Sequence, residues 1–315
     1  MHVAIASHYR LPVAQYGGTE RVVVALARGL VSIGHRVTLL AAPGTAVPDV
    51  AVMPVPAGVL TDPALDLATL APYDADILHA HFLLARTPSR PYVQTLHGHL
   101  PQGASPPPHT IFLSRAHAAH YGRDAFVYNG LDPVDYECRA TKDAYDLFLG
   151  RLHRAKGYRW AIEGARRSGR PLVVAGGWRP SLRGGLRFVG TVGGSRKRTL
   201  LAGARCLWAP AQWDEPFGLT TIEALFSGTP VLGTRRGALP EVVSPTVGAL
   251  GDSLDELIAA RPLLETRTAA ACRAHAERYF SHGVMAAAYV RMYVGLLEQG
   301  TLPAGCPTPW APSAT

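Results

Sequence analysis

Two glutamates in one short stretch of the sequence have the spacing and surroundings of a ligand-binding site. Seven residues separate Glu215 from Glu223. The turn-forming residues Pro216 and Gly218 lie between them, just ahead of the apolar run 219–225 (LTTIEAL), which predicts a helix. The sequence therefore places one carboxylate in the loop before a helix and the other on the helix itself.

A helix that begins after Gly218 would present the backbone N–H groups of Leu219, Thr220 and Thr221, together with the positive end of its dipole. Such a helix end favours an anion, and a phosphate above all. Glu223 would lie roughly 7–8 Å along the helix axis, so the two glutamates could reach a sugar on one side of the anion and a ribose on the other. Taken singly, each glutamate is also compatible with an ordinary acidic side chain, one in a loop and one on the surface of a helix, that binds no ligand.

A second group of charges follows the apolar strand predicted at Asp146–Gly150. Arg151 and Lys156 flank the loop that leads into a helix predicted at Tyr158–Ser168. A guanidinium and an ammonium group together suit a diphosphate, and the Walker pattern GxxxxGK[ST] is absent. Arginine outnumbers lysine 28 to 3 in the chain, which makes Lys156 conspicuous. The alternative is that both are ordinary surface charges.

Histidines end two of the predicted strands, Asp76–His79 and Pro91–Leu96. The pairs are His79 with His81 and His97 with His99. Polar residues at the carboxyl ends of parallel strands are where open α/β sheets bind ligands. No cysteine or carboxylate cluster completes a metal site, so we expect no metal. For His79 and His81, lining the acceptor side of a site and capping a strand both stay open.

The glycine pair Gly17-Gly18 joins a first strand, His2–Ser7, to a helix predicted at Arg21–Ile33. Glycines at a helix start let the backbone approach a ligand closely, although a plain tight turn explains them equally well. The GxGxxG fingerprint is absent, which disfavours a nicotinamide-dependent oxidoreductase.

The whole chain alternates strand and helix patterns, which predicts parallel α/β architecture. Further strands are expected at 36–42, 110–113, 125–128, 171–176, 186–190 and 206–209. The proline-rich segment Pro101–Pro108 is expected to be a loop, and a long helix is expected near 282–298.

Composition indicates a globular enzyme with two domains: 315 residues, 48% hydrophobic and 17% charged. No apolar run is long enough for a membrane span, and the N-terminus lacks the pattern of a signal peptide. The four cysteines, Cys138, Cys206, Cys272 and Cys306, have no metal spacing and are expected to be reduced thiols in a cytoplasmic protein.

The net charge of +8 is unevenly distributed along the chain. Residues 1–135 carry 8 basic and 9 acidic residues, a balance of −1, whereas residues 136–315 carry 23 and 14, a balance of +9. The near-neutral first part offers anionic lipid little attraction, so no stable membrane association is expected. Because no DNA-binding motif or basic stripe interleaved with aromatic residues appears, a diphosphate ligand explains the basic half better than nucleic acid does.

The run EPFGLTTIEAL, followed by SGTPVLGTRRGALPEVV, resembles the E-x7-E signature of the retaining nucleotide-sugar glycosyltransferases of family 4. The resemblance implies the GT-B fold, with two Rossmann-like parallel-sheet domains facing a central cleft and a C-terminal helix that returns to the N-terminal domain. The pattern Arg-x4-Lys-Gly at 151–157 also matches this family. Residues 128–133 (YNGLDP) resemble the phrase that closes its N-terminal domain.

By this resemblance, Glu215 would hold hydroxyls of the donor sugar and Glu223 the ribose diol. His97 would orient the sugar, and Gly17-Gly18 would face the donor phosphate and sugar. The backbone at Thr191 and Val192 would contact the base. Arg151, Lys156 and the amides of Leu219, Thr220 and Thr221 would stabilise the leaving diphosphate.

The expected domains are 1–135, joined by the returning helix at about 282–300, and 136–281, with a loose tail at 301–315. The expected function is retaining transfer of a sugar from a UDP or GDP sugar to an acceptor hydroxyl, on a soluble glycoside, glycan or natural-product scaffold. No cofactor is expected beyond this substrate. Two alternatives stay open: a sugar-nucleotide 2-epimerase and a non-catalytic sugar-nucleotide-binding protein.

Overall fold

The computed structural model describes residues 1–13, 17–181 and 184–312 as two compact units. The N-terminal unit comprises Met1–Val13, Gly17–Asp132 and Ser281–Cys306. The C-terminal unit comprises Pro133–Phe280 and the segment 307–312. The chain therefore passes from one unit to the other at Asp132, at Phe280 and at Cys306.

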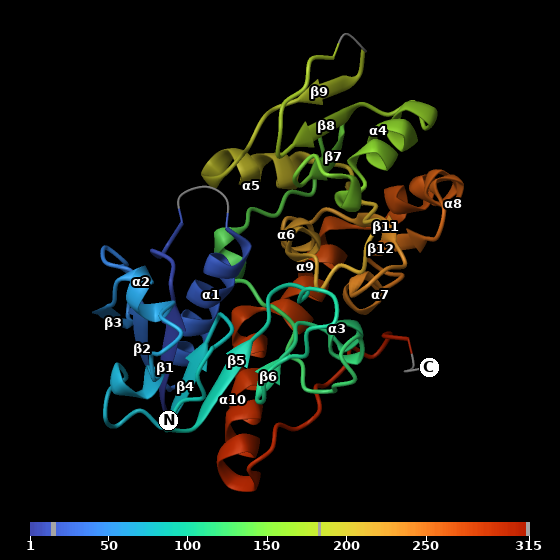
Figure 1. Ribbon diagram of the computed structural model, residues 1–315. Coiled ribbons are helices and arrows are strands. Elements are labelled where there is room, and N and C mark those ends of the chain that lie inside the picture. Colours follow the sequence, from blue (N-terminus) through green and yellow to red (C-terminus); the bar gives the residue numbers. More distant parts are fainter. Residues whose placement is uncertain (14–16, 182–183, 313–315) are drawn as a thin grey trace. The chain divides into compact units, whose positions relative to one another are not determined.

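The N-terminal unit is built on a parallel six-stranded sheet of order β3-β2-β1-β4-β5-β6 (Figure 1). Its strands are β1 (His2–Ser7), β2 (Arg36–Ala41), β3 (Ala51–Pro54), β4 (Ile77–Ala80), β5 (Tyr92–Thr95) and β6 (Thr110–Ile111). Its helices are α1 (Gly18–Ser32), α2 (Ala57–Leu60), α3 (Arg115–Ala119) and α10 (His282–Gln299), with a 3-10 turn, η1 (Leu67–Thr69). The central strands are buried along almost their whole length, as in parallel sheets covered on both faces.

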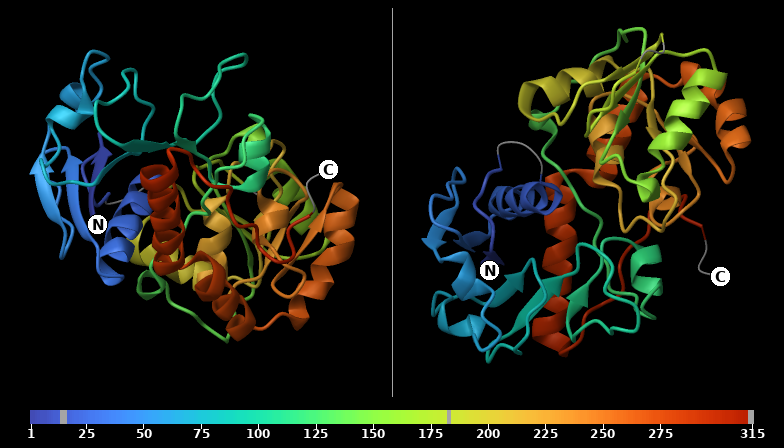
Figure 2. Two further views of the ribbon diagram at one scale, coloured as in Figure 1. Left: turned by 90° about the horizontal axis from the view of Figure 1, so that it is seen from below. Right: turned by 45° about the horizontal axis from the view of Figure 1, so that its top comes forward.

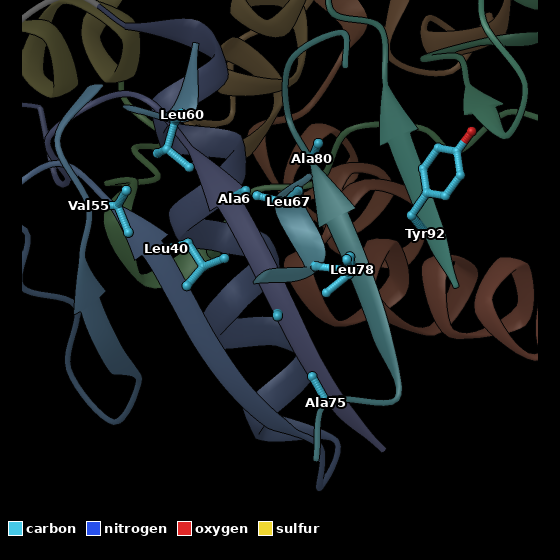
Figure 3. Close-up of a cluster of buried hydrophobic side chains, with 11 residues drawn as sticks. Ala6, Leu40, Val55, Leu60, Leu67, Ala75, Leu78, Ala80 and Tyr92 are labelled. Atoms are coloured by element: carbon cyan, nitrogen blue, oxygen red, sulfur yellow. The ribbon is translucent and has the colours of Figure 1, made fainter. Parts of the chain in front are cut away.

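Two different layers cover the faces of this sheet. Helices α1 and α10 lie side by side, as two further views show (Figure 2). They approach so closely that a Cβ on Gly29 would lie 2.4 Å from the carbonyl oxygen of His282. A separate cluster joins the segment 55–75 to the strands, and Figure 3 shows Leu40, Ala6 and Leu78 from neighbouring strands within it.

The C-terminal unit repeats the architecture with a second parallel sheet of order β12-β11-β10-β7-β8-β9. Its strands are β7 (Asp146–Leu149), β8 (Leu172–Ala175), β9 (Leu186–Phe188), β10 (Leu207–Ala209), β11 (Val231–Thr234) and β12 (Gly248–Gly251). Its helices are α4 (Tyr158–Arg167), α5 (Gly194–Gly203), α6 (Leu219–Phe226), α7 (Leu239–Val242), α8 (Leu254–Ala260) and α9 (Ala269–Phe280), with 3-10 turns η2 (Pro133–Asp135), η3 (Arg154–Lys156) and η4 (Arg261–Thr266).

A fully buried ion pair anchors the first strand of this unit. Arg261 donates to both carboxylate oxygens of Asp146, at 2.8 and 2.6 Å, and the indole of Trp208 donates to the same carboxylate at 3.0 Å. Because three donors bind the buried carboxylate of Asp146, the first residue of β7 is fixed in the core.

Comparison with the sequence analysis confirms the fold class of two parallel α/β units, with the last long helix returned to the N-terminal one. Two expectations are wrong. Residues 125–128 form no strand and contribute only an isolated bridge between Phe126 and Phe112. The tail is not loose over its described part: the amide of Gly305 donates to the carbonyl of Asp124 at 2.8 Å, and the buried hydroxyl of Thr308 donates to that of Glu241 at 2.7 Å.

Candidate active site

The loop between β10 and α6 ends at a glycine whose backbone only glycine adopts readily. Gly218 is the N-cap of α6 with φ 84° and ψ 62°, in the left-handed region. A Cβ placed there would lie 3.3 Å from Oγ1 of Thr221 and 3.6 Å from Cγ of Glu215. The helix start therefore lies beside Glu215, as the sequence predicts.

One of the three amides assigned to the anion site is not available. The N–H of Thr221 donates to the carbonyl of Gly218 at 2.9 Å, which closes a turn at the start of the helix. The correction leaves the amides of Leu219 and Thr220, which lie in the first turn, where a helix supplies no acceptors of its own. Any anion at this helix end would meet two backbone donors.

Glu215 and Lys156 form an ion pair across two loops of the C-terminal unit. Nζ of Lys156 lies 2.5 Å from Oε2 of Glu215, and the indole N–H of Trp213 donates to the same oxygen at 2.9 Å. Nζ also lies 5.1 Å from the centre of the Trp213 ring, within range of a cation–π contact. Both of these contacts fall on Oε2, so Oε1 is the oxygen that a ligand hydroxyl can approach.

The lysine loop reaches Glu215 because it packs against the segment that follows β10. Gly157 has φ 72°, and a Cβ there would lie 1.7 Å from the carbonyl oxygen of Pro210. The amide of Gln212 also donates to the carbonyl of Ala155 at 2.7 Å. Arg151, the other proposed clamp residue, is exposed at the end of β7. Thus the structure joins Lys156 to Glu215, whereas Arg151 stays on the surface.

Glu223 is fully buried, and two side chains bind it. Nζ of Lys197 in α5 lies 2.6 Å from Oε1, and the hydroxyl of Tyr136 donates to the same oxygen at 3.1 Å. The carboxylate predicted for the ribose diol therefore already has a cation and a hydroxyl donor. Lys197 was not predicted as a site residue, although lysine is rare in this chain and Lys156 was singled out for that reason.

The residues expected at the base and phosphate lie in loops at the starts of helices. Thr191 is exposed and the side chain of Val192 is buried, both in the loop from β9 to α5. Gly17 is buried as the N-cap of α1, and Gly18 is the first residue of that helix. A Cβ on Gly17 would lie 2.7 Å from Oε2 of Glu20, so a larger residue at this position would require the Glu20 side chain to move.

Four of the histidines in the N-terminal unit are held neutral. Burial lowers the pKa of His79 to about 3, of His97 to about 4 and of His117 to about 3, and it lowers the pKa of His81 well below its ordinary value. His79 is fully buried between the hydroxyls of Tyr293, at 2.7 Å, and Thr95, at 2.8 Å. His79 therefore joins β4 to α10 and β5 and does not line a surface. His97 is half-buried, with Nε2 lying 2.9 Å from Nδ1 of His81.

Two family models match successive parts of the chain: Glycosyltransferase Family 4 over residues 16–132 and Glycosyl transferases group 1 over residues 145–264. The crystal structure of AviGT4, a glycosyltransferase involved in avilamycin A biosynthesis, is 30% identical in sequence. The similarity covers 96% of this chain and 99% of that one, with a TM-score of 0.80. The chain belongs to the GT-B glycosyltransferases.

Two further proteins share less sequence with this glycosyltransferase. An uncharacterized glycosyltransferase of Methanocaldococcus jannaschii is 25% identical over 154 residues, a stretch that is 39% of this chain and 39% of that protein's length. HepE of Anabaena, solved in complex with UDP-glucose, is 18% identical, with a TM-score of 0.63 over 91% of this chain and 97% of that one. At this identity HepE shares the fold.

Across the described part of this glycosyltransferase, no group of three or more His, Cys, Asp or Glu side chains is arranged to hold a metal ion. Within the same residues, no helix is both long and apolar enough to cross a membrane.

Proposed function

We propose that this glycosyltransferase transfers a sugar, with retention at the anomeric carbon, from a nucleoside-diphosphate sugar to an acceptor hydroxyl. The observation that carries the proposal is the pair of Lys156 with Oε2 of Glu215 beside the N-terminus of α6, in a chain of the GT-B family. In this pair, Lys156 would supply a cation for a phosphate and Glu215 a carboxylate for a sugar hydroxyl. A UDP sugar is supported by the complex of HepE with UDP-glucose, and a GDP sugar remains compatible.

Each group would act on a different part of the donor. Lys156, the surface Arg151 and the amides of Leu219 and Thr220 would stabilise the negative charge that grows on the leaving diphosphate. Oε1 of Glu215 would accept a hydrogen bond from a hydroxyl of the sugar. Glu223 would accept a hydrogen bond from a ribose hydroxyl through Oε2, because Lys197 and Tyr136 both contact Oε1.

Retention without a covalent intermediate fits this set of groups. The carboxylate nearest the proposed sugar site, Glu215, is held by Lys156 and Trp213, which stabilise it as an anion that binds hydroxyls. The acceptor oxygen would attack on the face from which the phosphate leaves, as the bond from the anomeric carbon to the phosphate oxygen breaks. The leaving phosphate would take the acceptor's proton, so that charge and protons balance.

A small soluble acceptor fits the protein better than a lipid-linked one. AviGT4 is involved in avilamycin A biosynthesis, and a biosynthetic intermediate or a small glycoside would suit a related enzyme.

The four cysteines, Cys138, Cys206, Cys272 and Cys306, are all free thiols. Free thiols agree with a reducing compartment, and we place the protein in the cytoplasm.

The test is incubation with UDP and GDP sugars, first without an acceptor and then with a panel of small glycosides. Slow hydrolysis without acceptor and transfer with it support the proposal, and the anomeric coupling constant of the product reports retention. An epimerised sugar nucleotide would instead identify a 2-epimerase. Donor binding in a thermal-shift assay without any turnover would identify a non-catalytic sugar-nucleotide-binding protein.

A further inference from the structure

A contact between two histidines of the N-terminal unit bears on which nitrogen of His97 can meet a ligand. His81 directly follows β4, and its amide donates to the carbonyl of Ala6 in β1 at 3.0 Å. Nδ1 of His81 lies 2.9 Å from Nε2 of His97, and the two rings stack with centroids 5.1 Å apart. One of these nitrogens must donate the hydrogen bond and the other must accept it.

Only two arrangements of protons are possible at neutral pH. Burial lowers the pKa values of both rings below 6.5, so each ring carries a single N–H. Either His81 donates from Nδ1 and has a bare Nε2, or His97 donates from Nε2 and His81 carries its proton on Nε2. The surroundings of the second nitrogen of His81 distinguish these arrangements.

Nε2 of His81 is buried, and no residue in the described parts of the chain hydrogen-bonds to it. A proton on this nitrogen would be a buried N–H without an acceptor, which folded proteins very rarely contain. A bare nitrogen leaves only a lone pair unmatched, and unmatched acceptors are the commoner exception. The proton of His81 therefore belongs on Nδ1, and His81 donates to His97.

We propose that His81 is a positioning residue, which fixes His97 in the tautomer that presents Nδ1–H to the donor sugar. The inference rests on the proposed function, together with the role that the sequence resemblance implies for His97, which is to orient the donor sugar. Among the described residues, none hydrogen-bonds to Nδ1 of His97, and the ring is half-buried. An uncharged N–H suits a hydroxyl or ring oxygen of a sugar, whereas a phosphate would favour a charged donor.

Two substitutions of His81 separate this role from simple packing. His81→Asn keeps an N–H donor close to the place of Nδ1 but loses the ring, and His81→Phe keeps a stacked ring without a donor. If His81 positions His97, His81→Asn retains kcat/KM within about threefold and His81→Phe loses about tenfold, the value of one hydrogen bond. If His81 only fills space, the order is reversed. The same two substitutions at exposed His120 serve as matched controls and should leave kcat/KM unchanged.

A direct measurement on the substrate-free protein tests the tautomer whether or not transfer is ever detected. In a sample labelled with 15N-histidine, the nitrogen shifts and couplings of His97 should identify Nδ1 as the protonated nitrogen at pH 7. His81→Asn should keep this pattern, and His81→Phe should give a mixture of tautomers. A wild-type His97 protonated on Nε2 would overturn the proposal. The pattern expected here, together with an absence of transfer from every donor, would leave the positioning contact standing and refute the proposed function instead.

Discussion

The pair of Lys197 with Glu223 gives the sharpest prediction, because one partner is almost completely removed from water. The side chain of Glu223 is 1% exposed and that of Lys197 is 13% exposed. Lys197→Met removes the cation and leaves a buried carboxylate that still accepts a hydrogen bond from the neutral hydroxyl of Tyr136. Breaking a buried pair in this way costs about 3–5 kcal/mol of the free energy of unfolding. The slight exposure of Lys197 places the expected value at about 3 kcal/mol.

The assay is thermal and urea unfolding of four proteins: the wild type, Lys197→Met, Glu223→Gln and the double variant. The C-terminal unit is centred on Pro133–Phe280, and for a unit of roughly 150 residues each kcal/mol lowers Tm by about 2–4 °C. Lys197→Met should therefore lower Tm by about 6–12 °C. Since Glu223→Gln removes the charge that needs compensation, the double variant should be more stable than Lys197→Met alone, with a coupling energy of about 1–3 kcal/mol.

An exposed pair in the same unit provides the control. Nη2 of Arg166 lies 2.5 Å from Oε1 of Glu163, but the two side chains are 55% and 41% exposed. Arg166→Met should cost less than about 0.5 kcal/mol. If Lys197→Met costs no more than Arg166→Met, the reasoning is refuted, and Glu223 does not depend on Lys197 in the free protein.

Other consequences can be checked separately. Lys156→Ala should lower kcat/KM at least ~100-fold, since a charge-assisted contact to phosphate in a closed site is worth about 2–4 kcal/mol; the exposed neighbour variant Arg154→Ala should not, and normal turnover of Lys156→Ala would move the diphosphate elsewhere. Turnover should survive excess EDTA, because the proposed site meets the diphosphate charge with side chains and amides; activity lost to EDTA and restored by Mg²⁺ would contradict this. The folded-state pKa of His97 is about 4, below the ordinary value of 6.5, so the unfolded chain binds this proton first as the pH falls. Stability should therefore decrease from about pH 6.5 toward pH 4, by up to ~1.4 kcal/mol per pH unit for each such histidine, and a urea midpoint unchanged between pH 7 and 5 would refute it. Nζ of Lys142 donates to two carbonyls and the hydroxyl of Thr229, so Lys142→Arg should destabilise the protein by about 1–3 kcal/mol because a planar guanidinium cannot satisfy all three acceptors; the control Arg139→Lys, at a surface pair, should cost under about 0.5 kcal/mol, and equal stabilities would contradict this role of Lys142.

The sequence predicts most of the buried strands because their apolar runs are continuous. The expected strand at His2–Ser7 coincides with β1, and the one at Asp146–Gly150 differs from β7 by a single residue. No strand is assigned to Ala51–Pro54, Val231–Thr234 or Gly248–Gly251, which form β3, β11 and β12. Strand β3 is a largely exposed edge strand that ends in proline, and β12 begins and ends with glycine, so neither has a composition typical of strands. Strand β11 is fully buried, but it has only four residues and one of them is a glycine.

The parts of the site that lie within one short segment are the parts that local pattern predicts. Glu215, Gly218 and the start of α6 are close in sequence, and the structure puts them together. The partner of Glu223 is 26 residues away on another helix, and its approach depends on how α5 packs beside α6. A charge pair of this kind has no signature in sequence spacing. The contact of Lys197 with Glu223 could therefore not be predicted from the sequence.

The scarcity of lysine in this chain indicates more site residues than Lys156 alone. Only three of the 31 basic residues are lysines. In the structure, the ammonium group of each lysine contacts oxygen acceptors. Nζ of Lys142 donates to two carbonyls and a hydroxyl, those of Ala202, Ser227 and Thr229, at 2.8, 3.2 and 3.0 Å, and burial lowers its pKa to about 8. Lys156 and Lys197 each direct the same group at one glutamate oxygen.

A planar guanidinium forks its donors within one plane, whereas an ammonium can satisfy acceptors that converge on a single point. This distinction applies to Lys142, whose three acceptors converge on Nζ, whereas Lys156 and Lys197 each contact one glutamate oxygen. Rarity drew attention to Lys156 alone because it stood beside a recognisable loop. The same reasoning applied to all three lysines would have pointed to Lys197 as well, but its partner Glu223 depends on how α5 packs beside α6. Scarcity in a biased composition can therefore single out a basic residue from the sequence, whereas the acceptor that this residue meets follows from the packing of the fold.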